Sequence, residues 1–290
     1  MFVAFARAPA RNGGSTGGLC LFLLSCGLLL AARVAGAGAE LVAERVTPSV
    51  FGGGQRTVAA QFRNGAQGPV EEALQLRLYQ ASASTLAPVE EARPWKTLSL
   101  PAGQVALESL PITFPAVRSE TIFHIAVFSG EKKLGALPVR VFPEELLKPL
   151  TILAGGREVG LLDPEGTLRP SFASVPTVEL KQAEDILATE SQLIIVAPVS
   201  PESRPAGLAA VLKRKAASGA AIVWIQPPVR RVSEPLPEAY VWSESGGNIV
   251  IAQASTVDDF SHSPRAQLNL LRLAELATGH KKLQLPADPP

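Results

Sequence analysis

The chain has 290 residues, of which 47% are hydrophobic and 18% are charged. This composition can form a packed core and differs from that of disordered chains. The formal net charge is only +1, so the chain lacks the basic surface that binding to nucleic-acid phosphates requires, and we expect no nucleic-acid partner.

Residues 1–39 have the three parts of a cleavable signal peptide. Arg7 and Arg11 give a positive start, residues 19–32 form an apolar stretch, and small residues follow. Two overlapping Ala-x-Ala sites end the segment. We expect cleavage after Ala39, with Ala37 as the second choice, and export to the periplasm or the medium. The alternatives are a retained anchor and lipidation at Cys26. The apolar stretch is shorter than the about 20 residues of a spanning helix, so we expect no transmembrane span after cleavage.

Both cysteines of the chain, Cys20 and Cys26, lie in this segment. A mature protein beginning near Glu40 would therefore contain no disulfide, no cysteine nucleophile and no thiolate metal site. It would also be slightly acidic, because the three charges of the segment are all positive.

Residues 41–143 have the pattern of an all-β domain, with short apolar runs between turn signals. In 73–79, leucines alternate with polar residues, which predicts a strand with one buried face. The expected strands are 58–63, 73–79, 96–100, 121–128 and 134–141. The motifs V-x-x-Q-F-x-N-G (58–65), L-P-A-G-Q (100–104) and P-V-R-V-F-P (138–143) resemble those of the immunoglobulin-like domains of bacterial exported proteins. That resemblance implies a β-sandwich without the cysteine pair of antibody domains.

After a joint at 143–149, residues 150–280 have an α/β pattern. We expect a first strand at 150–153, and the continuous apolar runs 192–198 and 220–226 predict strands covered on both faces. A helix over 207–218 would connect them as a right-handed βαβ unit. Gly246-Gly247 predicts an edge hairpin joining 240–243 to 248–253.

The last helix is expected to begin at Ser263-Pro264 and to end at Gly279. Its polar residues recur at every third position and predict one narrow solvent-exposed stripe: Asn269, Arg272, Glu275 and Thr278. The tail, 281–290, is expected to be flexible.

The second half resembles the Rossmann-like domains related to class I glutamine amidotransferases. The residues that carry this resemblance are DILATESQLIIVAP (185–198), the helix, and Ser218-Gly219 leading into AIVWIQPP (221–228). The enzymes of that family need a cysteine in a G-x-C-x-G turn. Here the turn after Val196 is Ala-Pro-Val-Ser-Pro, so the resemblance implies the fold without the activity.

Two groups of residues were candidates for chemistry. Ser200 with Asp258 or Asp259 and His262 has the chain order of a hydrolase triad. However, prolines flank Ser200 in place of the G-x-S-x-G glycines, and the serines can instead begin or cap helices. The segment from Asp258 to His262 can also lie at the carboxyl edge of a parallel sheet, where ligands bind. Its acids can equally complement a helix dipole.

Metal and cofactor sites are not expected. His124, His262 and His280 are far apart in the sequence, and the glycines at 52–54 and 155–156 lack the G-x-G-x-x-G spacing. Trp95 and Trp242 are candidate platforms for sugar stacking, whereas Trp224 lies in a buried run.

The sequence therefore predicts an immunoglobulin-like β-sandwich (41–143) followed by a Rossmann-like α/β domain (150–280). The expected function is that of an exported, non-enzymatic binding or assembly component of the cell envelope or the secreted fraction, with an unknown protein or polysaccharide partner. The alternatives are a serine-type hydrolase with a site near Ser200 and Asp258/His262, and a carbohydrate-binding accessory protein.

Overall fold

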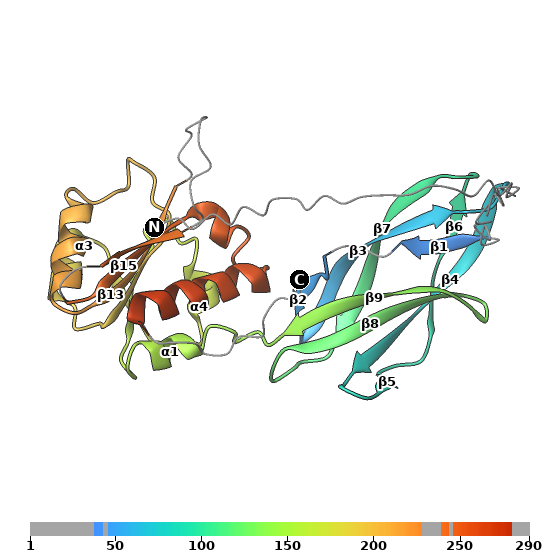
Figure 1. Cartoon of the computed structure of the whole chain (residues 1–290), viewed down its shortest axis with the longest axis horizontal. Helices are drawn as coiled ribbons and strands as arrows, with labels where there is room; N and C mark the ends of the chain where they lie inside the picture. The colour runs from blue at the N-terminus through green and yellow to red at the C-terminus, as the bar shows by residue number, and fades with distance from the viewer. Residues whose placement is uncertain (1–37, 43–45, 228–238, 244–245, 280–290) are drawn as a thin grey trace, which may run out of the picture. The chain divides into compact units, whose positions relative to one another are not determined.

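The computed structural model describes residues 38–42, 46–227, 239–243 and 246–279 (Figure 1). The expected signal peptide, apart from Gly38 and Ala39, and the expected tail lie outside these residues. Of the described residues, 43% are in strands and 20% in helices. The strands form three sheets.

The first half of the chain contains two sheets. One has the order β1-β3-β7, with β1 Ala39–Val42, β3 Gly54–Asn64 and β7 Val105–Phe114. The other has the order β2-β9-β8-β4-β5, and β6 pairs with β4. Its strands are β2 Ser49–Phe51, β4 Val70–Ala81, β5 Leu86–Pro88, β6 Arg93–Leu100, β8 Thr121–Ser129 and β9 Lys132–Phe142.

Side chains of both sheets form one hydrophobic core. In β4, Leu74, Leu76 and Leu78 are buried while the intervening residues are more exposed. This alternation follows the two-residue period of a strand, and it confirms the half-buried strand expected at 73–79. Phe62 of β3 and Ile112 of β7 belong to the same core.

The second half contains a six-stranded sheet in the order β11-β10-β12-β13-β15-β14. Its strands are β10 Val159–Leu162, β11 Thr177–Leu180, β12 Leu193–Val196, β13 Ala221–Gln226, β14 Ala239–Ser243 and β15 Asn248–Gln253. The first five in this order pair in parallel, and β14 is an antiparallel edge strand. The expected edge hairpin is thus confirmed.

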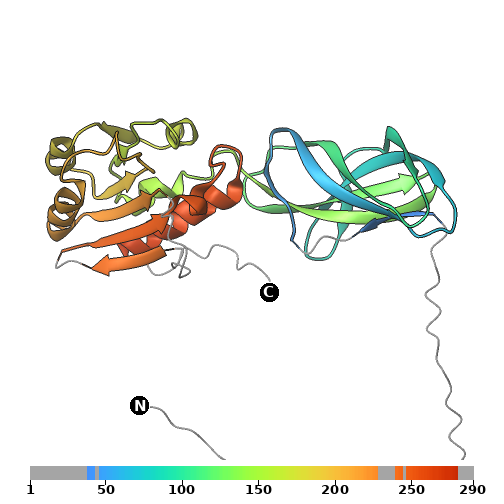
Figure 2. The same ribbon diagram turned by 90° about the horizontal axis from the view of Figure 1, so that it is seen from above.

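Helices cover both faces of this sheet, as Figures 1 and 2 show for α3 and α4. The helices are α1 Pro149–Leu153, α2 Ala183–Ala188, α3 Leu208–Ala217 and α4 Pro264–Thr278. Residues of α1 and α4 share a core with Leu193, Ile195 and Val223. On the other face, residues of α2 and α3 pack with Ile194 and Val196. Because the strands are buried on both sides, their sequences are continuously apolar.

The predicted fold class is wrong. The described chain is mostly β with parallel and mixed sheets, and does not form a clear all-β immunoglobulin-like sandwich followed by a Rossmann-like domain. In the first half β2 pairs in parallel with β9, where Arg140 N donates to Pro48 O. The apolar pattern that predicted the strands contains no information on the direction of their pairing.

Two local predictions in the second half are also wrong. Residues 149–153 form helix α1 and not a strand, because Pro149 at the first position suits a helix N-terminus. In α4, Glu275 is not part of an exposed stripe: it is 9% exposed, whereas Leu276 is 54% exposed. The expected ends of α4 are confirmed. The Ser263 side chain accepts a hydrogen bond from Ala266 N, and Gly279 follows the helix in a left-handed conformation.

No helix in the described part of the chain has the length and apolar character to span a membrane.

Candidate functional site

The order of the parallel strands defines one place where the chain changes direction across the sheet. From β10 the chain continues to β11 on one side, whereas β12, on the other side of β10, is followed outward by β13 and β15. At the carboxyl ends of strands β10 and β12, the loops that follow them therefore diverge. Ligands of open α/β sheets bind in the crevice at such a switch point.

A cavity of about 400 Å³ lies at this place. Thr167 and Leu168 come from the loop after β10, Pro198 follows β12, and the remaining residues follow β15. Its lining consists of Thr167, Leu168, Pro198, Ala254, Val257, Asp258, Asp259, Phe260, Ser261 and His262. Among these, the charged or ionisable side chains are the two aspartates and the histidine. The candidate site thus combines an apolar wall with an acidic segment, and we call it the carboxyl-edge pocket.

The wall formed by the loop after β10 is held by Asp163, which is 1% exposed. Its Oδ1 accepts hydrogen bonds from the backbone N and the hydroxyl of Thr167, at 2.9 and 3.1 Å. Its Oδ2 accepts from Leu168 N and Arg169 N, both at 2.8 Å. Four donors compensate the buried carboxylate, which would otherwise be costly. Asp163 therefore fixes the position of Thr167 and Leu168 in the pocket.

The acidic segment is a tight turn just before α4. Asp259 has φ 52°, the left-handed region, and among the described residues it is the one non-glycine with a positive φ. Its carbonyl oxygen accepts from His262 N and Ser263 N, at 3.0 and 2.9 Å. Its Oδ1 lies 3.0 Å from His262 Nδ1. Both side chains are largely exposed, 83% for His262 and 70% for Asp259, so solvent and solutes can reach them.

The proposed triad residues are only partly brought together. His262 contacts Asp259, but Ser200 has other partners: its Oγ accepts from Ser203 N at 3.4 Å and its N donates to Glu165 Oε1 at 2.9 Å. No hydrogen bond joins Ser200 to His262 or Asp258 among the residues that the structure describes. Ser200 is also not one of the residues lining the carboxyl-edge pocket.

The two candidate tryptophans lie in different sheets. Trp95 in β6 is half-buried and packs against the core of the first half, with its ring centroid 6.2 Å from that of Phe62. Lys96 Nζ lies 5.2 Å from the centroid of the Trp95 ring. Trp242 lies in edge strand β14, opposite Ile249, and its side chain is outside the described part.

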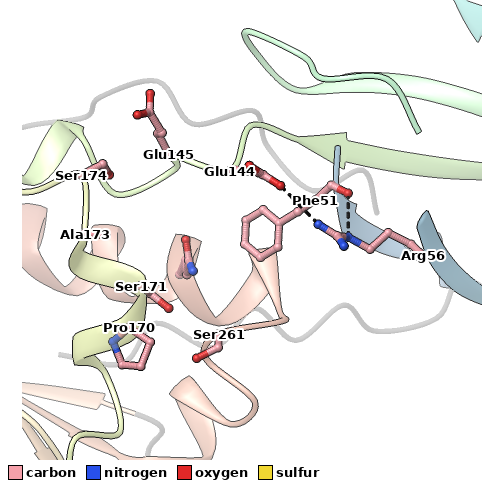
Figure 3. Close-up of a pocket in the computed structure, with 10 residues that line it drawn as sticks. Phe51, Arg56, Glu144, Glu145, Pro170, Ser171, Ala173, Ser174 and Ser261 are labelled. Carbon is pink, nitrogen blue, oxygen red and sulfur yellow. Dashed lines mark hydrogen bonds and ion pairs between the residues drawn. The ribbon is translucent and has the colours of Figure 1, made fainter. Parts of the chain in front are cut away.

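A second cavity, of about 410 Å³, is lined by the residues drawn in Figure 3. Gln267 in α4 is 3% exposed; its Nε2 donates to Phe260 O at 3.2 Å, and within the described part of the chain its Oε1 has no hydrogen-bond partner. Figure 3 also shows Arg56, whose Nε donates to Phe51 O at 3.1 Å and which pairs with Glu144. The lining residues are Phe51, Arg56, Glu144, Glu145, Pro170, Ser171, Ala173, Ser174, Ser261 and Gln267.

Within the described ranges, no group of three or more histidine, cysteine, aspartate or glutamate side chains is placed to hold a metal ion.

Sequence reasoning identified the segment from Asp258 to His262 but missed Asp163 and Glu165. The available signal was the Asp-Pro-Glu-Gly sequence at 163–166 directly after an apolar run. Aspartate followed by a turn sequence often accepts backbone hydrogen bonds from the residues that follow it.

Comparisons with known proteins leave the chain without a family. No family model and no curated protein matches it. Among solved structures, a β-glucosidase from Listeria innocua in complex with gluconolactone matches over 36% of this chain and 16% of its own, at 19% identity and a TM-score of 0.27. An alkylpurine DNA glycosylase from Pseudomonas fluorescens bound to DNA matches over 37% and 31%, at 14% identity and 0.26. The chain thus spans about a sixth of the enzyme that it matches first, and similarities of this size carry no argument about fold or function.

Proposed function

We propose that the protein is an exported, non-enzymatic binding component of the cell envelope or the secreted fraction, and that the carboxyl-edge pocket is its ligand site. The observation that carries the proposal is the convergence of three loops, after β10, β12 and β15, on one pocket at the switch point of the sheet. Export is supported by the signal-peptide pattern of residues 1–39.

The lining of the pocket favours a ligand that carries an ammonium group beside an apolar part. Asp258 and Asp259 supply negative charge, and among the lining residues that the structure describes there is no lysine or arginine. Leu168 and Phe260 supply apolar surface nearby. A protein partner can offer a lysine side chain, and a polysaccharide can offer a free amino sugar. Both would meet the same chemistry in the pocket.

Binding is better supported than hydrolysis. In a working triad the serine hydroxyl donates to the histidine. Here Ser200 Oγ accepts a backbone hydrogen bond in its own loop, and His262 pairs with Asp259. The geometry of the described residues therefore offers a charged recognition surface and no activated nucleophile.

The test is isothermal titration calorimetry of the exported protein with spermidine, a small polyamine, at low ionic strength. We expect binding that weakens at least about tenfold, or about 1.4 kcal/mol, in Asp258→Asn/Asp259→Asn. The matched control is Glu184→Gln/Glu190→Gln, which removes two exposed charges outside the pocket and should bind normally.

Equal weakening in both double variants would mean that spermidine responds to net charge alone, which contradicts the assigned site. Absence of binding to the unaltered protein would contradict the ligand class. Turnover of an ester such as p-nitrophenyl acetate that is lost in Ser200→Ala would contradict the non-enzymatic function.

A further inference from the structure

The contacts at the start of strand β1 indicate where the signal peptide is cleaved. This inference rests on the proposed export. The two overlapping Ala-x-Ala sites allow a cut after Ala37 or after Ala39. The second cut would remove Gly38 and Ala39 from the mature protein. The structure describes both residues, and their contacts distinguish the two possibilities.

Ala39 belongs to the folded domain. It is 3% exposed, is part of the core of the first half, and is paired with Asn64 of β3. Gly38 also contributes, because its carbonyl oxygen accepts a hydrogen bond from Gly65 N at 3.2 Å. A cut after Ala39 would remove these contacts from the edge of the β1-β3-β7 sheet.

Glu72 of β4 lies against the same two residues. Its Oε1 accepts a hydrogen bond from Ala39 N at 3.0 Å, and its Oε2 is buried without a hydrogen-bond partner among the described residues. Gly38 is close to this carboxylate. A Cβ built on Gly38 would lie 2.6 Å from Glu72 Oε1 and 2.8 Å from Lys132 Nζ. The backbone nitrogen of Gly38 is attached to the same Cα, so it lies in the immediate surroundings of Glu72.

We propose that the chain is cut between Ala37 and Gly38, and that the new α-ammonium group of Gly38 forms an ion pair with Glu72. Water hydrolyses the peptide bond, catalysed by a leader peptidase of the cell. The carboxylate stays on Ala37 and the amine, which takes up a proton, on Gly38. The orphaned Oε2 of Glu72 then gains a charged donor, and a buried acceptor without a partner is removed.

One feature of Gly38 suits this role. The position that a Cβ would take is already occupied by Glu72 and Lys132, so a residue with a side chain would not fit here. Lys132 is the other charged group here, and its ammonium group repels the new α-ammonium group of Gly38. Glu72 therefore lies close to two cationic groups after cleavage.

The first experiment is expression of the full chain in a bacterial host that exports it, followed by N-terminal sequencing and intact mass of the exported protein. We expect Gly38 as the first residue. A protein that begins with Glu40 overturns this inference while leaving export intact. An exported protein that retains residues 1–37 contradicts cleavage, and a chain found only inside the cells contradicts the proposed export itself.

The second experiment measures the pKa of the N-terminal α-amino group by pH-dependent labelling of the exported protein. A carboxylate that contacts an amine raises the pKa of that amine. We therefore expect the pKa of the α-amino group to be about one unit lower in Glu72→Gln than in the unaltered protein. Glu71→Gln is the matched control, because Glu71 is exposed on the opposite face of β4. An equal pKa in the unaltered protein and in Glu72→Gln overturns the ion pair.

Discussion

The environment of Glu275 differs from what its sequence position suggests. It is almost fully buried in α4, and one of its carboxylate oxygens has no hydrogen-bond partner in the ranges that the structure describes. Burial raises its pKa above the ordinary value, and the positive charge of Arg272 opposes this only in part. Burial therefore disfavours the charged form of this carboxyl group relative to the same group in water.

This shift has a defined effect on stability against pH. The pKa of Glu275 is higher in the folded state than in the unfolded state. Its contribution to the stability of the folded protein is therefore fully present below the unfolded pKa of about 4.5, and it is lost as pH rises through the folded pKa. Glu275→Gln should thus raise the stability of the protein at neutral pH and give no gain near pH 4. Thermal unfolding at both pH values measures this. Glu184→Gln changes an exposed site, so its effect on stability should be the same at the two pH values.

At the scale of elements, the β14–β15 hairpin is attached closely to its surroundings. A Cβ on Gly247 would occupy the space of the carbonyl oxygen of Ala220 and would lie 2.9 Å from that of Ala216, at the end of α3. Asn248 Nδ2 donates to Ala277 O of α4 at 3.2 Å. The turn is therefore in contact with helices on both faces of the sheet.

Gly247→Ala should destabilise the protein by about 2–3 kcal/mol, because backbone atoms must move to admit the methyl group. The control is Gly68→Ala, since a Cβ at Gly68 meets nothing within 4 Å, and it should change stability by less than about 0.5 kcal/mol. Chemical unfolding measures both. Similar stabilities of the two variants would show that the hairpin turn is not packed as described.

The elements show what can be predicted from the sequence. Strands β4, β8, β12 and β13 were predicted because burial leaves a direct trace in apolar spacing, and the ends of α4 because Ser263, Pro264 and Gly279 have local roles. The parallel pairing of β2 with β9 was not predicted, because pairing direction depends on residues far apart in the chain. Helix α1 was not predicted either, since its short apolar run was interpreted as a strand. In the site, the acidic segment was found, but Asp163 was not, because its role is to order backbone atoms of its own loop.

At the scale of the whole molecule, the two halves have separate cores. The buried residues of the first half form one cluster, and those of the second half form two clusters, one on each face of the six-stranded sheet. Stability in the described part therefore rests on apolar packing, and neither of the chain's cysteines lies in it. Both precede the proposed cut.

Thiol titration of the denatured, exported protein tests this organisation. We expect no reactive thiol after export and two in the uncut chain, because Cys20 and Cys26 would leave with the signal segment. A reducing agent should accordingly leave the unfolding temperature of the exported protein unchanged. Two thiols in the exported protein would mean that the segment is retained.

The four hydrogen bonds to Asp163 have a consequence for the kinetics of recognition. Since the loop after β10 is already ordered in the free protein, a ligand meets one wall of the pocket in its final shape and loses little entropy in arranging it. The wall formed by the segment from Asp258 to His262 carries the exposed side chains of Asp259 and His262, and these side chains can adjust after contact. A pocket with one rigid and one adaptable wall suits rapid capture of partners that share a charged group and differ elsewhere.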